Sequence, residues 1–327
     1  MTHVTRAVVS ILVLMGCVHA VNGFAQAYPT RAVRVIVPYG AGGGSDILGR
    51  LIGAKVGEEF GQQMLIDIRP GGNATIGTQM MARAAPDGYT IGVIDSAFTT
   101  NPALFTNLPY DALKDFAPIT SMASSPFILL AHPSLPVKTV KELVALAKAR
   151  PGQMPFGHAG SGTGSYLALQ LFRSVTSINV IQVPYKGAGP AVIGLISGEV
   201  TIFFGLPAAM TQYVKAGKSR ALAVTAEKRY PGLPDVPTLV EAGIQGVDAN
   251  PFWGIVAPAG TPAAIVNRLY ESFAKQIKAQ EMRQRLIDMA FVPVANTPAE
   301  FAAFLRTDVL RWGKVVKDVG IPAQSLQ

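Results

Sequence analysis

Residues 33–46 read VRVIVPYGAGGGSD, and residues 154–165 read MPFGHAGSGTGS. Each stretch places an apolar, strand-like run before a glycine-rich loop, and we expect a helix to follow the loop in both cases. The first backbone N–H groups of a helix lack intrahelical partners and carry a partial positive charge, so such an end suits an anion. Two such stretches, one in each half of the chain, predict a cleft that closes around an anion from both sides.

Strand-like and helix-like segments alternate along the chain around these two stretches. Short apolar runs predict strands at 34–38, 64–68, 89–94, 127–131, 179–183, 200–204 and 221–225. Apolar residues at helical spacing predict helices at 46–60, 75–84, 137–149, 163–175 and 188–197. This alternation predicts an α/β fold with mainly parallel sheets.

Two further amphipathic helices are expected in the last part of the chain. Thr261 and Pro262 offer an N-cap followed by proline at the first helical position. Thr297 and Glu300 have the spacing of a capping box in front of a second helix. Terminal helices of this kind usually pack back onto an earlier sheet.

The position of these helices predicts two domains, the second inserted into the first. We assign residues 28–126 and 253–327 to domain 1, and residues 127–252 to domain 2. Two crossing strands, near Phe127 and Trp253, would then join the domains. A pair of crossings is the physical basis of a hinge, because a few residues can absorb the rotation.

The first 27 residues have the pattern of a secretory signal peptide. Arg6 precedes an apolar run, and the Ala-Gln-Ala sequence at 25–27 fits the small-x-small rule for cleavage, so Tyr28 is expected to begin the mature chain. Cys17 offers the alternative of a lipoprotein, although Met15 fits that cleavage pattern poorly. We therefore expect export by a cleavable signal peptide.

Composition narrows the function classes. The net charge of +8 at pH 7 favours an anionic ligand. The sequence contains no dense block of lysine and arginine, so we expect no nucleic acid partner. Cys17 is the single cysteine, and only His132 and His158 lie outside the expected signal peptide, so we expect no metal site. Ile47 and Ser165 stand where a G-x-G-x-x-G fingerprint needs glycine, so no nucleotide cofactor is expected. With no G-x-S-x-G elbow and no cysteine nucleophile, we expect no catalytic residues and no enzyme.

The loops after the expected strands supply the candidate ligand contacts. Ser45 or Asp46 could instead cap the first helix, and Thr163 or Ser165 could cap a later one. Lys186 could pair with a carboxylate or remain solvated, and His158 could donate to a ligand or pack within its loop. The candidates are Tyr39, Gly40, Ala41, Gly42, Gly43, Ser45, Asp46, Ser96, His158, Ala159, Gly160, Ser161, Gly162, Thr163, Ser165, Tyr185, Lys186 and Gly187.

Further motifs are spread along the chain. They are RPGGNATIG at 69–77, APDGYTIGV at 85–93, NPALF at 101–105, VPYKGAGPA at 183–191, PDVPTLVEAGI at 234–244 and FWGIVAPAGTP at 252–262. Together with the two glycine loops, this ordered set resembles the Bug family, periplasmic solute receptors associated with tripartite tricarboxylate transporters. The resemblance covers nearly the whole mature chain. Family members often carry a small hydroxyl residue at the position of His158 and a histidine at that of Tyr166.

The resemblance implies a bilobal fold of the periplasmic-binding-protein type. It implies a small carboxylate held largely by backbone amides and water at the loops 39–46 and 158–165, with Tyr39, Phe98, Tyr166 and Tyr185 as candidate walls. It also implies a monomeric periplasmic receptor that serves transporter membrane subunits. Two alternatives remain: a sensing receptor for a signalling partner, and a secreted enzyme that acts on an anionic substrate.

Overall fold

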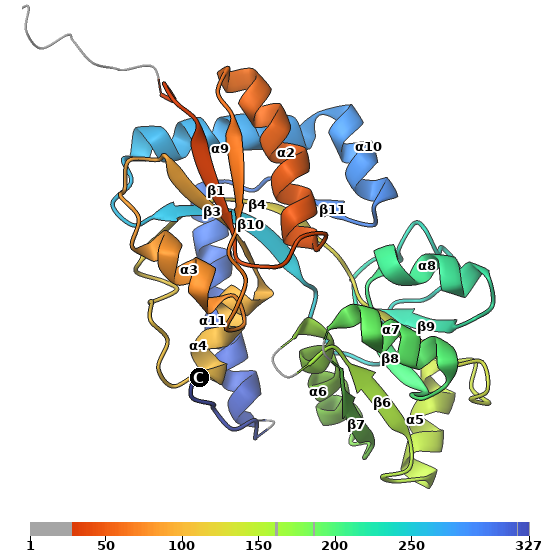
Figure 1. Ribbon diagram of the computed structural model, residues 1–327. Coiled ribbons are helices and arrows are strands. Elements are labelled where there is room, and N and C mark those ends of the chain that lie inside the picture. The colour runs from red at the N-terminus through yellow and green to blue at the C-terminus, as the bar shows by residue number, and fades with distance from the viewer. Residues whose placement is uncertain (1–27, 161–162, 186, 319, 327) are drawn as a thin grey trace, which may run out of the picture.

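The computed structural model describes residues 28–160, 163–185, 187–318 and 320–326. Figure 1 shows two α/β lobes, one formed by the beginning and the end of the chain and the other by its middle. Each lobe has its own sheet with helices on both faces. The expected fold class, a two-lobed α/β protein of the periplasmic-binding-protein type, is confirmed.

The sheet of the first lobe has six strands in the order β11-β4-β10-β3-β1-β2. These are β1 (Val33–Val37), β2 (Met64–Ile68), β3 (Thr90–Asp95), β4 (Phe116–Ser124), β10 (Phe252–Pro258) and β11 (Val292–Pro293). Strand β1 runs parallel to β2 and β3, whereas β10 runs antiparallel to β3 and β4. The sheet is therefore mixed.

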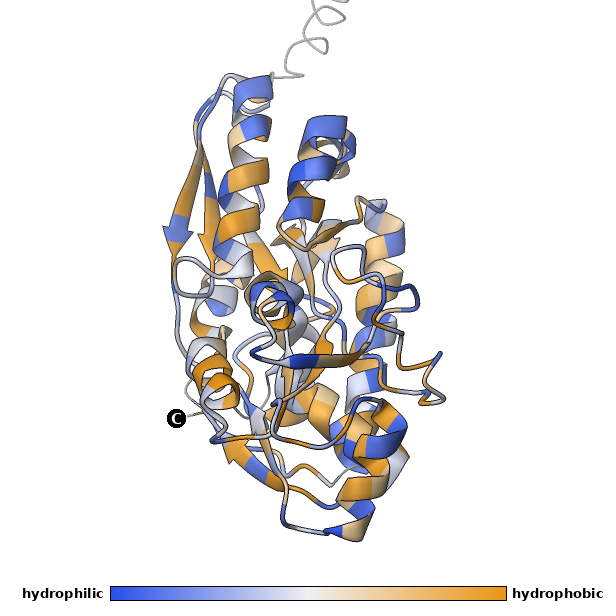
Figure 2. Ribbon diagram, turned by 90° about the vertical axis from the view of Figure 1, so that its right-hand side faces the viewer, coloured by the Kyte–Doolittle hydropathy of each residue, from blue (hydrophilic) through white to orange (hydrophobic). Residues whose placement is uncertain are grey.

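Six helices cover this sheet: α2 (Gly44–Phe60), α3 (Thr75–Ala82), α4 (Ser96–Leu104), α9 (Ala263–Lys278), α10 (Gln280–Asp288) and α11 (Pro298–Asp318). Side chains alternate across a strand, so β1 directs Val35 toward α2 and α9 and Ile36 toward α3, α4 and α11. Figure 2 shows the matching alternation of hydrophobic and hydrophilic residues along the helices. Burial of one apolar stripe on each helix holds the layers together.

The sheet of the second lobe has five strands in the order β7-β6-β8-β5-β9. They are β5 (Ile128–Ala131), β6 (Pro155–His158), β7 (Ile181–Pro184), β8 (Ile202–Gly205) and β9 (Arg220–Val224). Helices α5 (Val140–Ala149) and α6 (Gly164–Thr176) pack on one face, and α7 (Ala188–Ser197) and α8 (Pro207–Lys215) on the other. Strand β6 is parallel to β7 and β8, and β5 is antiparallel to β8 and β9.

The expectation of mainly parallel sheets is wrong for both lobes. It came from counting strand–helix alternations, which favour parallel neighbours. Strands β4, β5 and β10 lie beside the passages between the lobes and pair antiparallel with their neighbours, so each sheet combines both orientations.

The chain passes between the lobes twice, from β4 to β5 and from β9 to β10. Hydrogen bonds tie the two passages together. The Phe127 backbone N–H donates to Thr225 Oγ1 at 2.8 Å, and the Thr225 N–H donates to the Phe127 carbonyl at 2.9 Å. The Ser125 N–H donates to the Pro251 carbonyl at 3.0 Å. Placing the domain limits at 126/127 and 252/253 stays a prediction.

Of the two helix N-termini predicted in the last part of the chain, one is confirmed and the other is wrong. The Glu300 N–H donates to Thr297 Oγ1 at 3.3 Å and the Thr297 N–H donates to Glu300 Oε2 at 2.8 Å, so the capping box is confirmed. The Thr261 cap is wrong, because α9 begins one residue later with Pro262 in the N-cap position. The Thr261 hydroxyl instead donates to the Pro258 carbonyl at 2.8 Å.

Helix α9 packs on the first lobe as expected, and so does α10, which was not predicted from the sequence, but α11 contacts both lobes. Phe301 and Leu305, near its start, belong to the apolar core of the first lobe. Trp312, farther along, is buried with the core of the second lobe. Arg311 lies between them and pairs with Asp248, in the passage back from the second lobe, at 3.3 Å. The C-terminal helix is therefore a third connection between the lobes.

Candidate ligand-binding site

A cavity of about 300 Å³ lies between the two lobes. Its first-lobe wall is polar and contains Tyr39, Asn73, Asp95 and Ser96. Its second-lobe wall combines Thr163 and Ser165 with backbone at Ala159 and Gly187, and apolar side chains complete the lining. This volume is at the lower end of the range for small-molecule sites.

Four helices direct their N-termini at this cavity, because the N-cap residues of α4, α6, α7 and α8 all line it. These residues are Asp95, Thr163, Gly187 and Leu206. Asp95 and Thr163 cap their own helices with side-chain oxygens. Gly187 has no side-chain acceptor, so the N–H groups of Ala188 and Gly189 at the start of α7 are left for solvent or for a ligand. Helix α8 offers less, because its first residue, Pro207, has no N–H and the Ala209 N–H donates to the Leu206 carbonyl at 3.1 Å. The second-lobe side of the cavity therefore attracts an anion.

The first-lobe wall is built around the carboxylate of Asp95. Its Oδ1 accepts a hydrogen bond from the Ala97 N–H at 2.9 Å and another from the Tyr39 hydroxyl. Burial raises the pKa of Asp95 from 3.8 to about 6, and the two hydrogen bonds offset only part of that effect. Burial and the neighbouring Asp95 raise the pKa of Tyr39, so the tyrosine stays a neutral donor.

Aromatic rings form part of the apolar lining. Phe127, Phe203, Phe204 and Trp253 face the cavity together with smaller aliphatic side chains. The rings of Phe127 and Phe204 lie 6.5 Å apart in an edge-on arrangement. Such walls bind a flat or extended apolar group through dispersion and burial.

Two glycines at helix starts let these rings approach the helices closely. A Cβ atom on Gly44, the first residue of α2, would lie 2.7 Å from the Trp253 indole. A Cβ atom on Gly164, the first residue of α6, would lie 3.0 Å from the Phe127 ring. Each glycine loop is thus fitted against an aromatic residue beside one of the two passages between the lobes.

Six of the residues predicted from sequence line the cavity, and others lie close to it without lining it. Those that line it are Tyr39, Ser96, Ala159, Thr163, Ser165 and Gly187. Those that do not are Gly40, Ala41, Gly42, Gly43, Ser45, Asp46, His158, Gly160 and Tyr185. Ser161, Gly162 and Lys186 lie outside the described residues. Ligand contact remains a prediction for all of them.

Asp46 has a structural role, but neither it nor Ser45 caps the first helix, because the N-cap of α2 is Gly43 and no side chain makes a capping hydrogen bond there. The Asp46 side chain is only 5 % exposed, and its carboxylate accepts from the Gly42 N–H at 2.9 Å and from Arg50 Nε at 2.6 Å. These bonds fix the first glycine loop at the start of α2. Ser45 is buried beside it.

His158 and Tyr185 do not line the cavity. His158 is 3 % exposed, its Nδ1 accepts from the Gly160 N–H at 3.3 Å, and burial lowers its pKa. The Tyr185 ring occupies the space beside Gly194 on α7, where a Cβ atom would lie 2.1 Å from the tyrosine oxygen. Both residues pack their own lobe. Of the other candidate walls, Phe98 is buried in the first-lobe core.

The sequence analysis missed Asp95 and most of the aromatic lining. Asp95 ends a buried strand and begins a helix, which is the same local pattern that drew attention to Ser45 and Asp46. The helix itself was missed because Pro102 interrupts it and its apolar residues follow no clear stripe. Asn73, in the second motif, also lines the cavity and donates to Asn101 Oδ1 at 2.8 Å.

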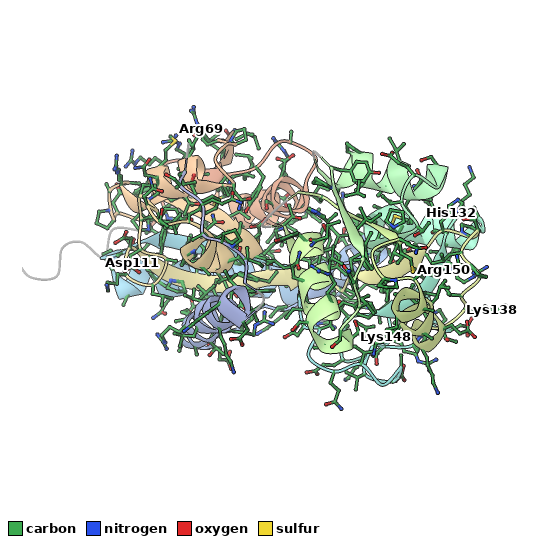
Figure 3. The ribbon with its side chains drawn as sticks, turned by 90° about the horizontal axis from the view of Figure 1, so that it is seen from below. Arg69, Asp111, His132, Lys138, Lys148 and Arg150 are labelled. Atoms are coloured by element: carbon green, nitrogen blue, oxygen red, sulfur yellow. The ribbon has the colours of Figure 1, made fainter. Side chains whose placement is uncertain are left out.

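Charged side chains gather on outer surfaces. In Figure 3, Lys138, Lys148 and Arg150 lie on the outside of the second lobe, and Arg69 and Asp111 on the first. Within the described ranges, no group of three or more His, Cys, Asp or Glu side chains is arranged to hold a metal ion. Over those same residues, no helix combines the length and apolar character needed to cross a bilayer.

Comparison with known proteins finds a family and several solved structures that this chain resembles. The model of the protein family described as "tripartite tricarboxylate transporter family receptor" matches residues 48–321. The periplasmic binding protein BugD is 31% identical, with a TM-score of 0.79 over 91% of this chain and 100% of BugD. Rpa4515 of R. palustris, solved with adipate, is 32% identical, with a TM-score of 0.82 over 91% and 100% of the two chains. MatC from Rhodopseudomonas palustris, solved with malate, is 32% identical, with a TM-score of 0.77 over 88% and 100%.

Proposed function

This chain belongs to the tripartite tricarboxylate transporter receptor family, whose members are solute-binding receptors, and on that basis we propose that it captures a small organic carboxylate between its lobes. The observation that carries the proposal is the pair of helix N-termini, those of α6 and α7, whose N-cap residues Thr163 and Gly187 line the same cavity. The ligands of its structural neighbours, adipate and malate, are carboxylates and support the same class.

Backbone N–H groups can hold such a ligand with enough free energy. A hydrogen bond to a charged group contributes about 1.5–3 kcal/mol. Micromolar affinity needs about 8 kcal/mol, so a few N–H donors from α6 and α7 and contact with the aromatic lining suffice. Closure of the lobes around the ligand would then give the loaded receptor a shape that a partner can tell from that of the empty receptor.

We propose a periplasmic location and delivery of the ligand to transporter membrane subunits. The signal-peptide pattern at residues 1–27 and membership of a periplasmic family support the location. A sensing receptor would use the same closure to present its lobes to a signalling protein. Interaction with the membrane subunits, measured with and without ligand, separates these two roles.

A screen of carboxylates against matched amides tests the proposed function. We expect carboxylates to raise the melting temperature and to bind with micromolar Kd in calorimetry, while the neutral amides of the same acids bind at least tenfold more weakly. Equal binding of acid and amide, or no binding of either, would contradict carboxylate capture.

Replacing His158 by serine should leave the affinity for the best carboxylate within about twofold of wild type from pH 5.5 to 8. Burial lowers the pKa of His158, so its imidazole is neutral over most of this range and cannot pair with the ligand as a cation. Calorimetric titrations of both proteins across that range provide the measurement. A gain in affinity at low pH that disappears only in His158→Ser would show that the imidazolium contacts the ligand.

Intact mass of exported protein tests the processing expected from the sequence. We expect a mature chain that begins at Tyr28, without lipid. A chain that begins at Cys17 and carries a diacylglyceryl group would show that the lipoprotein peptidase cleaves this precursor.

A further inference from the structure

We propose that Asp95 selects the ligand: the cavity takes a monocarboxylate with an apolar body and a hydroxyl group at the end opposite its carboxylate, and it disfavours dicarboxylates. The inference rests on the proposed function and adds to it the chemistry of the far end of the ligand. It departs from the structural neighbours, which were solved with the dicarboxylates adipate and malate.

The two polar ends of the cavity have opposite electrostatic character. Helices α6 and α7 bring N-terminal N–H groups to the second-lobe side, which suits a carboxylate. On the first-lobe side, the N-terminus of α4 is already occupied by the Asp95 carboxylate. A carboxylate bound at the second-lobe side would therefore direct its other end at a negative charge.

Asp95 has acceptor capacity left for a ligand. Both of its hydrogen bonds, from Tyr39 and from Ala97, go to Oδ1. Within the described part of the chain Oδ2 has no hydrogen-bond partner, and Asp95 lines the cavity. An ionised carboxylate only accepts hydrogen bonds, so the complementary ligand group is a donor such as a hydroxyl.

No lining residue that the structure describes offers a second carboxylate a compensating cation. The described lining contains no lysine, arginine or histidine. Two carboxylates that face each other in a partly desolvated cavity repel strongly. Between the two polar ends, the lining is largely aromatic and aliphatic, including Phe127, Phe203 and Trp253, which suits an apolar body.

Two ligand series that differ only at the far end test this selection. One is hexanoate, 6-hydroxyhexanoate and adipate, and the other is benzoate, 4-hydroxybenzoate and terephthalate. Calorimetry at pH 8 with the full mature chain keeps all the carboxylates ionised. The proteins are wild type, Asp95→Asn, and the control Asp288→Asn, which removes one exposed charge from the end of α10.

In at least one series, wild type should bind the hydroxy acid at least tenfold more tightly than the unsubstituted acid, and the dicarboxylate most weakly. Asp95→Asn should tighten dicarboxylate binding at least tenfold and reduce the advantage of the hydroxyl, while Asp288→Asn behaves as wild type. Asparagine retains an acceptor for the Ala97 N–H, so the cap of α4 survives the substitution.

The outcomes separate this inference from the proposed function. Carboxylate binding whose order is the same in wild type and Asp95→Asn would overturn the role of Asp95 and leave carboxylate capture standing. Tight binding of adipate or terephthalate to wild type would also overturn the selection. If none of the six acids binds either protein, the inference fails, and the wider screen of carboxylates against their amides decides the proposed function separately.

Discussion

Gly44→Ala is expected to weaken binding of the tightest carboxylate at least tenfold, whereas Gly43→Ala, one residue earlier, should change it less than threefold. The added Cβ atom at position 44 would lie 2.7 Å from the indole of Trp253, a distance that real Cβ atoms do not tolerate. Trp253 is 5 % exposed and packs edge-on against Phe291 on its other side. Relief of the clash must therefore move the indole into the cavity or shift the start of α2.

Gly43→Ala is a matched control because its surroundings are open. Its φ is −79°, which any residue adopts, and an added Cβ atom would meet only the Gly40 carbonyl at 3.6 Å. Calorimetric Kd values, with melting temperatures to confirm folding, provide the measurement. Equal affinities of the two variants would show that the contact between Gly44 and Trp253 does not shape the site.

This comparison also shows where reasoning from the sequence reached its limit. The two glycine loops were correctly singled out as special, because glycine clusters between a strand and a helix are uncommon unless backbone must approach something closely. The sequence analysis placed Gly43, but not Gly44, among the candidate ligand contacts. The structure assigns the close contact to Gly44, because the partner, Trp253, is about 200 residues away in the chain and only the fold brings it there.

Elements with clear boundaries were predicted almost to the residue. Strand β2 and helix α7 have the expected limits; α7 is enclosed by Gly187 and Gly198, both with positive φ. Strand orientation was not predictable in the same way. Alternation of strands and helices favours parallel pairing, but the antiparallel β10 enters the first sheet from a distant part of the chain.

Part of the polar lining was accessible from the sequence, although Asp95 and Asn73 were missed, and the apolar part was not accessible. Tyr39, Ser96, Thr163 and Ser165 follow strands at the edge where the loops meet, and that position is visible in a strand–loop–helix pattern. The aromatic lining comes from within or beside strands, where an apolar residue has the same appearance whether it faces a core or a cavity.

Asp95→Asn is expected to stabilise the ligand-free protein by roughly 3 kcal/mol at pH 8, because the substitution removes a charge that the folded state desolvates. Burial raises the pKa of Asp95 from 3.8 in the unfolded chain to about 6 in the folded protein. Below pH 3.8 both states hold the proton, and the carboxyl group has no effect on stability. As the pH rises from 3.8 to about 6, the unfolded state ionises first, so stability falls; above 6 the full penalty applies.

The gain from Asp95→Asn should therefore shrink as the pH falls, to about half of its pH 8 value at pH 5. The titratable side chains that face Asp95 are Tyr39 and Tyr110, whose raised pKa values keep them neutral throughout this range. Urea denaturation of both proteins at pH 5 and pH 8 measures the difference. The same gain at both pH values would mean that Asp95 titrates normally and that the carboxylate costs the fold nothing. A gain confined to high pH would mean that the protein retains a destabilising charge at its cavity, as expected if that charge acts on the ligand.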